Sequence, residues 1–233
     1  MTDGRTGTTS TIDATIAGLE IVHADEDLVV VDKPTGMPSV PARTPLDPAD
    51  VARVLADVFP WLEAAHRLDR DTSGLLVLAR SREVRGLVGR AFEAGLVTKR
   101  YLAVVHGVPP ADEAEVHLPL ADDPARPPRK RVDPILGRRA TTRWRVQERA
   151  TAATLVELEP VTGRSHQLRV HLAWLGCPIV GDRLYGRGDG PSLTLALRAC
   201  AITLPHPRTG RPLQLAARRP NGEPWSWFTA AWA

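Results

Sequence analysis

Short apolar runs alternate with amphipathic segments along most of the chain. The β-branched and aliphatic runs at residues 28–31 and 75–79 are too short for typical helices and predict buried strands. Further strand-like segments are residues 101–105, 142–146, 154–158 and 195–204. The second and third of these alternate in character, as the two arms of a hairpin do.

Three segments carry apolar residues at helical spacing. The first is expected to begin at Pro48, with Asp47 as its N-cap. The second follows Ser81 as N-cap and stops at Gly95, and the third covers residues 165–175. Few helices among many short strands predict an α+β fold, in which a mixed, mostly antiparallel sheet is flanked by a few helices and loops.

The remaining segments lack clear periodicity. Residues 1–18 are rich in Thr, Gly and Asp and are expected to form a disordered tail. Residues 109–139 are rich in Pro, Asp and Arg and are interpreted as a long excursion between strands. No repeat or linker divides the rest, so residues 19–233 are expected to form a single domain onto which the tryptophan-rich end packs back.

The composition narrows the class of protein. Of 233 residues, 43% are hydrophobic, which supports a sizeable core. The chain has no run of about 18 apolar residues, the length that a membrane span requires, and no signal-peptide pattern in its first twenty residues. Cys177 and Cys200 are too few for a disulfide scaffold and lack metal-site spacing. These features predict a cytoplasmic protein without a membrane partner.

The charge is unevenly distributed along the chain. Residues 1–60 have a balance of −6 and residues 61–233 a balance of +9, which gives the net +3. The segment 126–145 contains eight basic residues, among them Arg129, Lys130 and Arg131, and one acid, Asp133. Such a run is typical either of a nucleic-acid contact or of a solvated basic loop.

Familiar cofactor and metal motifs are missing. Residues 186–190 read Gly-Arg-Gly-Asp-Gly but lack the strand-to-helix context of a phosphate-binding loop. His166 and His171 lie five residues apart, which does not suit two ligands on one helical face, and no third ligand is nearby. We therefore predict neither a metal site nor a cofactor.

Two polar segments remain as candidate sites. Residues 66–74 place charged side chains directly before a buried strand, where a rigid scaffold presents functional groups. Residues 162–169 place Arg164 and Gln167 around a helix N-terminus, which favours anions. Each segment is also explained structurally, the first as a surface turn and the second as a capped amphipathic helix.

Together these two segments resemble the signature blocks of the RluA-type pseudouridine synthase family. The blocks are HRLDRDTSGLLVLAR at 66–80 and TGRSHQLRVHLAWLGCPIVGDRLYG at 162–186, with further matches at 29–39, 99–107, 137–146 and 195–210. The resemblance covers about residues 25–215 in the order of the family. It implies the pseudouridine synthase fold and isomerisation of uridine to pseudouridine in structured RNA, a stem-loop of rRNA or tRNA, without metal or organic cofactor.

The resemblance also assigns roles to individual residues. Asp69 corresponds to the essential carboxylate, Arg164 to its arginine partner, and Tyr101 to the residue that stacks on the uracil and is a candidate to handle the C5 proton. Arg67 corresponds to the side chain that fills the space of the flipped nucleotide. The carboxylate acts either through a covalent sugar adduct or by removing a ribose proton to give a glycal.

Further residues of the same blocks are expected to contact RNA. These are His66, His166 and Gln167, with Arg129, Lys130 and Arg131 from the basic segment. Asp71 is interpreted as a turn residue. The alternatives to this function are a catalytically idle RNA-binding protein of the same fold and a glycoside hydrolase built on Asp69 and Asp71.

Three features depart from the family pattern. Residues 39–41 read Ser-Val-Pro where Val-His-Pro is usual, and Arg198 stands where a histidine is usual. The family's common N-terminal RNA-binding module of S4 type is not expected, so RNA affinity is assigned to the catalytic domain. Nothing in the sequence requires more than a monomer.

Overall fold

The computed structural model describes residues 14–41, 48–190 and 193–229. The N-terminal half contains β1 (Ala14–Ile16), β2 (Leu19–Ala24), β3 (Leu28–Lys33), α1 (Val51–Val54), β4 (Glu63–Ala64), β5 (Ser73–Ala79), α2 (Arg82–Glu93) and β6 (Thr98–His106). The second half contains β7 (Glu113–His117), β8 (Leu120–Asp122), β9 (Lys130–Val132), β10 (Thr141–Arg149), β11 (Ala153–Pro160), α3 (Gln167–Trp174), β12 (Leu197–Pro205), β13 (Pro212–Ala216) and a 3₁₀ turn at Trp225–Trp227.

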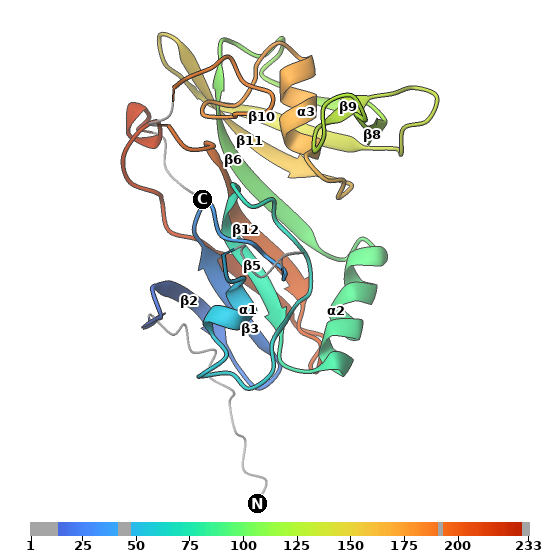
Figure 1. Cartoon of the computed structure of the whole chain (residues 1–233), viewed down its shortest axis with the longest axis vertical. Helices are drawn as coiled ribbons and strands as arrows, with labels where there is room; N and C mark the ends of the chain where they lie inside the picture. Colours follow the sequence, from blue (N-terminus) through green and yellow to red (C-terminus); the bar gives the residue numbers. More distant parts are fainter. Residues whose placement is uncertain (1–13, 42–47, 191–192, 230–233) are drawn as a thin grey trace, which may run out of the picture.

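One long sheet organises the described residues. Its strand order is β1-β2-β3-β5-β12-β6-β11-β10-β7, with β4 beside β5 and β13 beside β12, while β8 and β9 form a separate pair. Among the described strands β5 and β12 pair in parallel, and the other pairs are antiparallel. Figure 1 shows α2 beside one half of this sheet and α3, with β8 and β9, beside the other. The predicted α+β class is confirmed.

The continuous apolar strands are buried on both faces. In β3, Val29 and Val31 join one hydrophobic cluster while Leu28 and Val30 join a second, and β5 alternates in the same way. The second cluster includes Val84 of α2. Because helix and sheet cover both faces, alternation with polar residues is not needed, which explains the runs seen in the sequence.

Gly74 allows the parallel contact between β5 and β12. Its φ is +106°, and a Cβ at this position would lie 2.2 Å from the carbonyl oxygen of Ala199. No other residue type fits this approach without moving the backbone. The glycine therefore fixes the end of β5 that follows the 66–72 segment.

The helix predictions are met to different degrees. Helix α2 begins after Ser81, whose Oγ accepts a hydrogen bond from Val84 N at 3.2 Å, as predicted. Helix α1 is much shorter than predicted and is capped by Asp50, whose carboxylate accepts from Ala52 N. Pro48 lies outside the helix, and the expected cap Asp47 lies outside the described residues. Helix α3 begins at Gln167 because the preceding residue is left-handed.

Two segments that were expected to lack regular structure contain strands. Residues 14–16, expected to belong to a disordered tail, form β1 and pair with β2. The 109–139 excursion contains β7, which pairs with β10 at one end of the sheet order, and the β8–β9 pair. Val116 and Leu120 are buried, so these short strands have apolar anchors that the Pro- and Arg-rich composition concealed.

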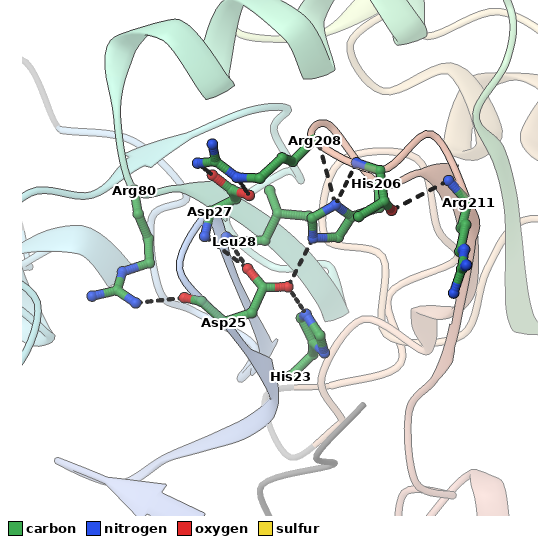
Figure 2. A network of polar contacts seen from close by, with 9 residues as sticks. His23, Asp25, Asp27, Leu28, Arg80, His206, Arg208 and Arg211 are labelled. Atoms are coloured by element: carbon green, nitrogen blue, oxygen red, sulfur yellow. Dashed lines mark hydrogen bonds and ion pairs between the residues drawn. The ribbon is translucent and has the colours of Figure 1, made fainter. Parts of the chain in front are cut away.

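A polar cluster joins the β2–β3 turn to the β12–β13 turn (Figure 2). Asp25 Oδ2 is hydrogen-bonded to His23 Nε2 at 2.6 Å and to His206 Nε2 at 3.1 Å, and Oδ1 accepts from two backbone amides. Asp27 accepts two hydrogen bonds from the Arg208 guanidinium. One side-chain oxygen or nitrogen atom from each of Asp25, Asp27 and His206 lies within 4.8 Å of the other two, a spacing at which such atoms could also bind a metal ion. The carboxylate oxygens of Asp25 and Asp27 already accept hydrogen bonds from protein groups. We therefore interpret the cluster as a structural link between the two turns and call it the clamp.

The described residues contain no helix long and apolar enough to cross a bilayer.

Replacing Asp25 with Ala should destabilise the protein. Burial raises the pKa of Asp25, but hydrogen bonds from His23, two backbone amides and His206 lower it overall, far below the usual 3.8. The substitution should cost about 2 kcal/mol in the free energy of unfolding at pH 7, measured by denaturant titration. Because a lowered pKa contributes stability above the unfolded value, the gap to wild type should narrow as the pH falls below 3.8.

The matched control is Glu26→Ala, an exposed acid in the same turn. Equal stability losses for both variants at pH 7 would contradict the clamp.

Candidate active site

A cavity of about 920 Å³ opens where three segments meet. They are the 65–72 segment before β5, the segment from the end of α2 into β6, and residues 159–169 up to the first turn of α3. The cavity lining includes His66, Arg67, Asp69, Tyr101, Arg164, His166 and Arg169. The two polar segments singled out in the sequence thus face one cavity.

The loop that carries Asp69 is held on both sides by residues of the 33–39 segment. Ser39 Oγ accepts from Leu68 N at 3.1 Å and donates to Leu68 O at 3.0 Å. The Lys33 ammonium, fully buried, donates to the carbonyl oxygens of Arg70 and Met37. Thr72 N donates to Asp69 O at 3.1 Å and closes the turn. Ser39, in the stretch that departs from the family pattern, is therefore a support for the Asp69 loop.

Lys33 also sets the charge beneath this loop. Burial lowers the pKa of Lys33 to about 8, while the carboxylates of Asp71, Asp69 and Asp32 act in the opposite direction. The ammonium remains mostly protonated at pH 7. It therefore supplies a positive charge and three donors beneath a turn that carries two aspartates.

Asp69 forms an ion pair with Arg169, which corrects the expected pairing with Arg164. Arg169 Nη1 lies 3.6 Å from Asp69 Oδ2, and the two side chains are 3% and 20% exposed. Arg164 instead donates from Nε to the carbonyl oxygen of Arg139 at 3.1 Å, at the cavity wall. The reason is positional, since Arg164 lies in the loop before α3 and Arg169 lies in the buried first turn of that helix.

A second carboxylate fixes the Arg169 guanidinium. Asp182, whose side chain is fully buried, accepts from Arg169 Nε at 2.8 Å and from Nη2 at 2.7 Å. The guanidinium carbon of Arg169 lies 5.3 Å from the centroid of the Tyr185 ring, and the guanidinium carbon of Arg129 lies 5.1 Å from the same centroid. A bidentate pair with stacking determines both the position and the plane of the guanidinium. Its remaining nitrogen, Nη1, faces Asp69.

Tyr101 lies in the middle of β6, opposite Leu158 of β11 and Ala199 of β12. It is 8% exposed and lines the cavity. Burial raises the pKa of Tyr101 strongly, and the charge of Asp69 raises it further. The phenol is therefore protonated at neutral pH, and its ring is available at the cavity wall.

His66 braces the segment through its ring, and it also lines the cavity. Its Nε2 accepts from Val77 N at 3.1 Å, and its ring lies 5.2 Å from the Phe92 ring. Burial, with the Lys99 charge, lowers the pKa of His66 to about 3, so the ring is neutral. The next residue, Arg67, is exposed and lines the cavity, consistent with the contact expected for it.

Gln167 is also a support, which corrects its expected RNA contact. It is 3% exposed, and its Oε1 accepts from Thr162 Oγ1 and Arg164 N. Its Nε2 donates to Thr141 O and Thr142 Oγ1. These four bonds use the whole amide and shape the 162–164 loop. The neighbouring His166 is left-handed, with φ of 58°, and its Nδ1 is hydrogen-bonded to Tyr185 Oη.

The basic segment is less free than its sequence suggests. Lys130 forms an ion pair with Asp122, and Arg131 forms one with Asp133 at 2.8 Å. Arg129 stacks on Tyr185. Strand pairing of β8 with β9 brings Asp122 opposite Lys130, a contact that the linear count of charges does not reveal.

The sequence comparisons define the class to which this fold and site belong. A family model described as RNA pseudouridylate synthase matches residues 27–174, and the chain belongs to this family. It is an isomerase that acts on RNA, as the resemblance implied.

Individual relatives agree with this assignment. The dual-specificity RNA pseudouridine synthase RluA of Haemophilus influenzae is 39% identical over 203 residues, which cover 86% of this chain and 93% of the relative. The RluA protein of Vibrio cholerae is 40% identical over 195 residues, covering 82% and 79%. The structure of human RNA Pseudouridylate Synthase Domain Containing 1 superposes with a TM-score of 0.74 at 28% identity, covering 88% and 85%.

Replacing Asp182 with Asn should impair catalysis through Arg169. The variant keeps the side-chain size but weakens the bidentate pair, so the guanidinium loses its fixed plane. We expect kcat for pseudouridine formation to fall about 100-fold, with RNA affinity within a few-fold of wild type. Release of tritium from RNA labelled at uridine C5 measures the rate.

The control is Asp189→Asn, in the same loop. Asp189 accepts from Gly181 N and pairs with His106, without a contact to Arg169. If Asp189→Asn lowers kcat per folded molecule as much as Asp182→Asn does, the anchoring of Arg169 is not the cause.

Proposed function

We propose that this pseudouridine synthase acts as a monomer in the cytoplasm on uridines presented by stem-loops of ribosomal or transfer RNA, with Asp69 as its essential carboxylate. The curated relatives are named dual-specificity enzymes, which supports more than one RNA substrate for this chain as well. Membership of the family favours this activity over an idle RNA-binding protein.

The reaction needs an ionised carboxylate that reaches the sugar of a flipped nucleotide. In one route an Asp69 oxygen attacks C1′, and the C1′–N1 bond breaks with its electron pair leaving on the uracil. After rotation C5 attacks C1′, the bond to Asp69 breaks, and the C5 proton is released. In the other route Asp69 removes a ribose proton, which expels the uracil and leaves a glycal. After rotation C5 attacks C1′, the ribose proton returns from Asp69, and the C5 proton is released.

Arg169 supports either route by holding the Asp69 carboxylate in place at the cavity wall. A guanidinium fixed 3.6 Å from Asp69 Oδ2 attracts the carboxylate and limits its orientation. The single observation that carries the proposal is this pair at the wall of a cavity that Tyr101 also lines.

Tyr101 and Arg67 contact the nucleotide in complementary ways. The raised pKa keeps the Tyr101 phenol protonated, which favours stacking on the uracil over action as a base. Arg67 is exposed, so its guanidinium plane can replace the base stacking that is broken when the nucleotide leaves its helix.

Asp69→Asn should abolish tritium release from uridine C5 in total tRNA and rRNA, because the amide is neither a nucleophile nor a base. RNA binding should stay within a few-fold of wild type. The matched control, Asp71→Asn, changes an exposed acid two residues away and should retain activity. Wild-type turnover by the Asp69→Asn variant would rule out the assigned role.

Lys130→Ala with Arg131→Ala should weaken RNA binding and make its salt dependence shallower. For each phosphate contact that the double variant loses, the slope of log K against log salt should become shallower by about one. Arg129 is left intact because it stacks on Tyr185 beside the site. The control removes two charges from the start of α2, with Arg82→Ala and Arg85→Ala. An identical slope for the two double variants would contradict an RNA contact at Lys130 and Arg131.

A further inference from the structure

Two large aliphatic side chains project into solvent from the loop that precedes β10. Ile135 is 88% exposed and Leu136 is 76% exposed, and the other exposed large hydrophobic residues of the described chain reach at most 62%. The two residues are adjacent, in the loop between β9 and β10. We call Ile135 and Leu136 the aliphatic tip.

The aliphatic tip sits on an ordered turn. Asp133 Oδ1 accepts from Ile135 N at 3.1 Å and from Leu136 N at 2.9 Å, and Asp133 O accepts from Gly137 N. A Cβ on Gly137 would lie 2.2 Å from Asp133 O and 2.7 Å from the backbone of Pro119, so the turn packs closely at its base. These contacts order the backbone of the turn, so little backbone entropy remains to be lost when the two side chains meet a partner.

The base of the loop is connected to the cavity. Arg138 and Leu120 exchange backbone hydrogen bonds at 2.8 and 2.9 Å. The carbonyl oxygen of Arg139 accepts from Nε of Arg164, which lines the cavity. The aliphatic tip is thus only a few residues along the chain from a direct contact with the cavity wall.

Basic residues flank the aliphatic tip on both sides in the sequence. Arg131, Arg138 and Arg139 are exposed, and the nearest acid in the sequence, Asp133, is engaged by the turn and by Arg131. An apolar tip within a cationic rim is complementary to a nucleic-acid helix, which offers apolar base faces between anionic backbones. A second protein would need a hydrophobic pocket rimmed by acids.

We propose that the aliphatic tip inserts between stacked bases of the substrate RNA while the arginine rim contacts the adjacent phosphates. Insertion would unstack a base step next to the nucleotide that enters the cavity, and so lower the cost of flipping it. This inference rests on the proposed function for the identity of the partner.

The test replaces both residues, as Ile135→Ser with Leu136→Ser, in the full-length protein. Binding is measured to folded bulk tRNA and to poly(U), which has no helix to open. The substitution should weaken binding to folded tRNA about tenfold and binding to poly(U) by less than about twofold. Ile135→Met with Leu136→Met should restore binding to tRNA, since length and apolarity are kept.

Two controls separate insertion from charge and from general effects. The tip variant should leave the salt slope unchanged, because apolar contacts release no counterions, whereas Arg138→Gln with Arg139→Gln should flatten it. Val108→Ser removes an aliphatic side chain that is 62% exposed and follows the C-terminal end of β6, whereas the cavity lies at the start of that strand. It should bind both RNAs as wild type does.

The proposal is overturned if the tip variant binds tRNA as wild type does, or if its affinity falls as much for poly(U) as for tRNA. It is also overturned if sedimentation shows that the tip mediates self-association while tRNA affinity is unchanged. Failure of the proposed function is distinct: wild type would release no tritium from tRNA or rRNA. In that case, insertion would still be supported if the tip variant lost affinity for folded tRNA and kept its affinity for poly(U).

Discussion

The active site depends on one guanidinium whose position is fixed before substrate arrives. Asp182 binds Arg169 through two hydrogen bonds and Tyr185 stacks against it, so a single nitrogen is directed at Asp69. Holding a charge in a site with little water is costly unless it is paired. Here two carboxylates share one cation, and the second of them is partly exposed to the cavity. Asp69 is therefore paired and still accessible from the cavity.

The rest of the fold brings Asp69 to this cation. Ser39 and Lys33 hold the two sides of its loop, and Gly74 lets β5 approach β12 closely enough to continue the sheet beneath it. Helix α3 lies beside the other half of the sheet (Figure 1), and it supplies Arg169. The site therefore forms where the N-terminal strands and the α3 segment meet, and each half contributes one member of the ion pair.

The sequence predicted the elements that have strong local signals. Ser81 as a cap, the buried run of β5 and the β10–β11 hairpin follow from composition and period alone, and the structure confirms them. The N-cap of α1 is Asp50, three residues after the expected Asp47. Which of several nearby acids caps a helix depends on the residue at which the helix begins, and tertiary contacts decide that residue. Residue types do not reveal such entry points.

The roles within the site were harder to predict for a similar reason. Arg164 and Arg169 belong to the same polar block, and sequence spacing does not show which of them turns inward. The answer depends on Asp182, thirteen residues beyond Arg169. Gln167 looked like a ligand-binding amide because it is polar and close to a helix start, yet its four bonds are internal.

Conservative replacement of the two arginines tests the central claim most directly. Lysine keeps the charge but cannot form the bidentate pair with Asp182 and present a second nitrogen to Asp69. Under single-turnover conditions, Arg169→Lys should slow tritium release from uridine C5 about 100-fold, while Arg164→Lys should stay within about tenfold of wild type. The opposite order of rates would contradict the account, because Arg164 would then be the cation that Asp69 requires.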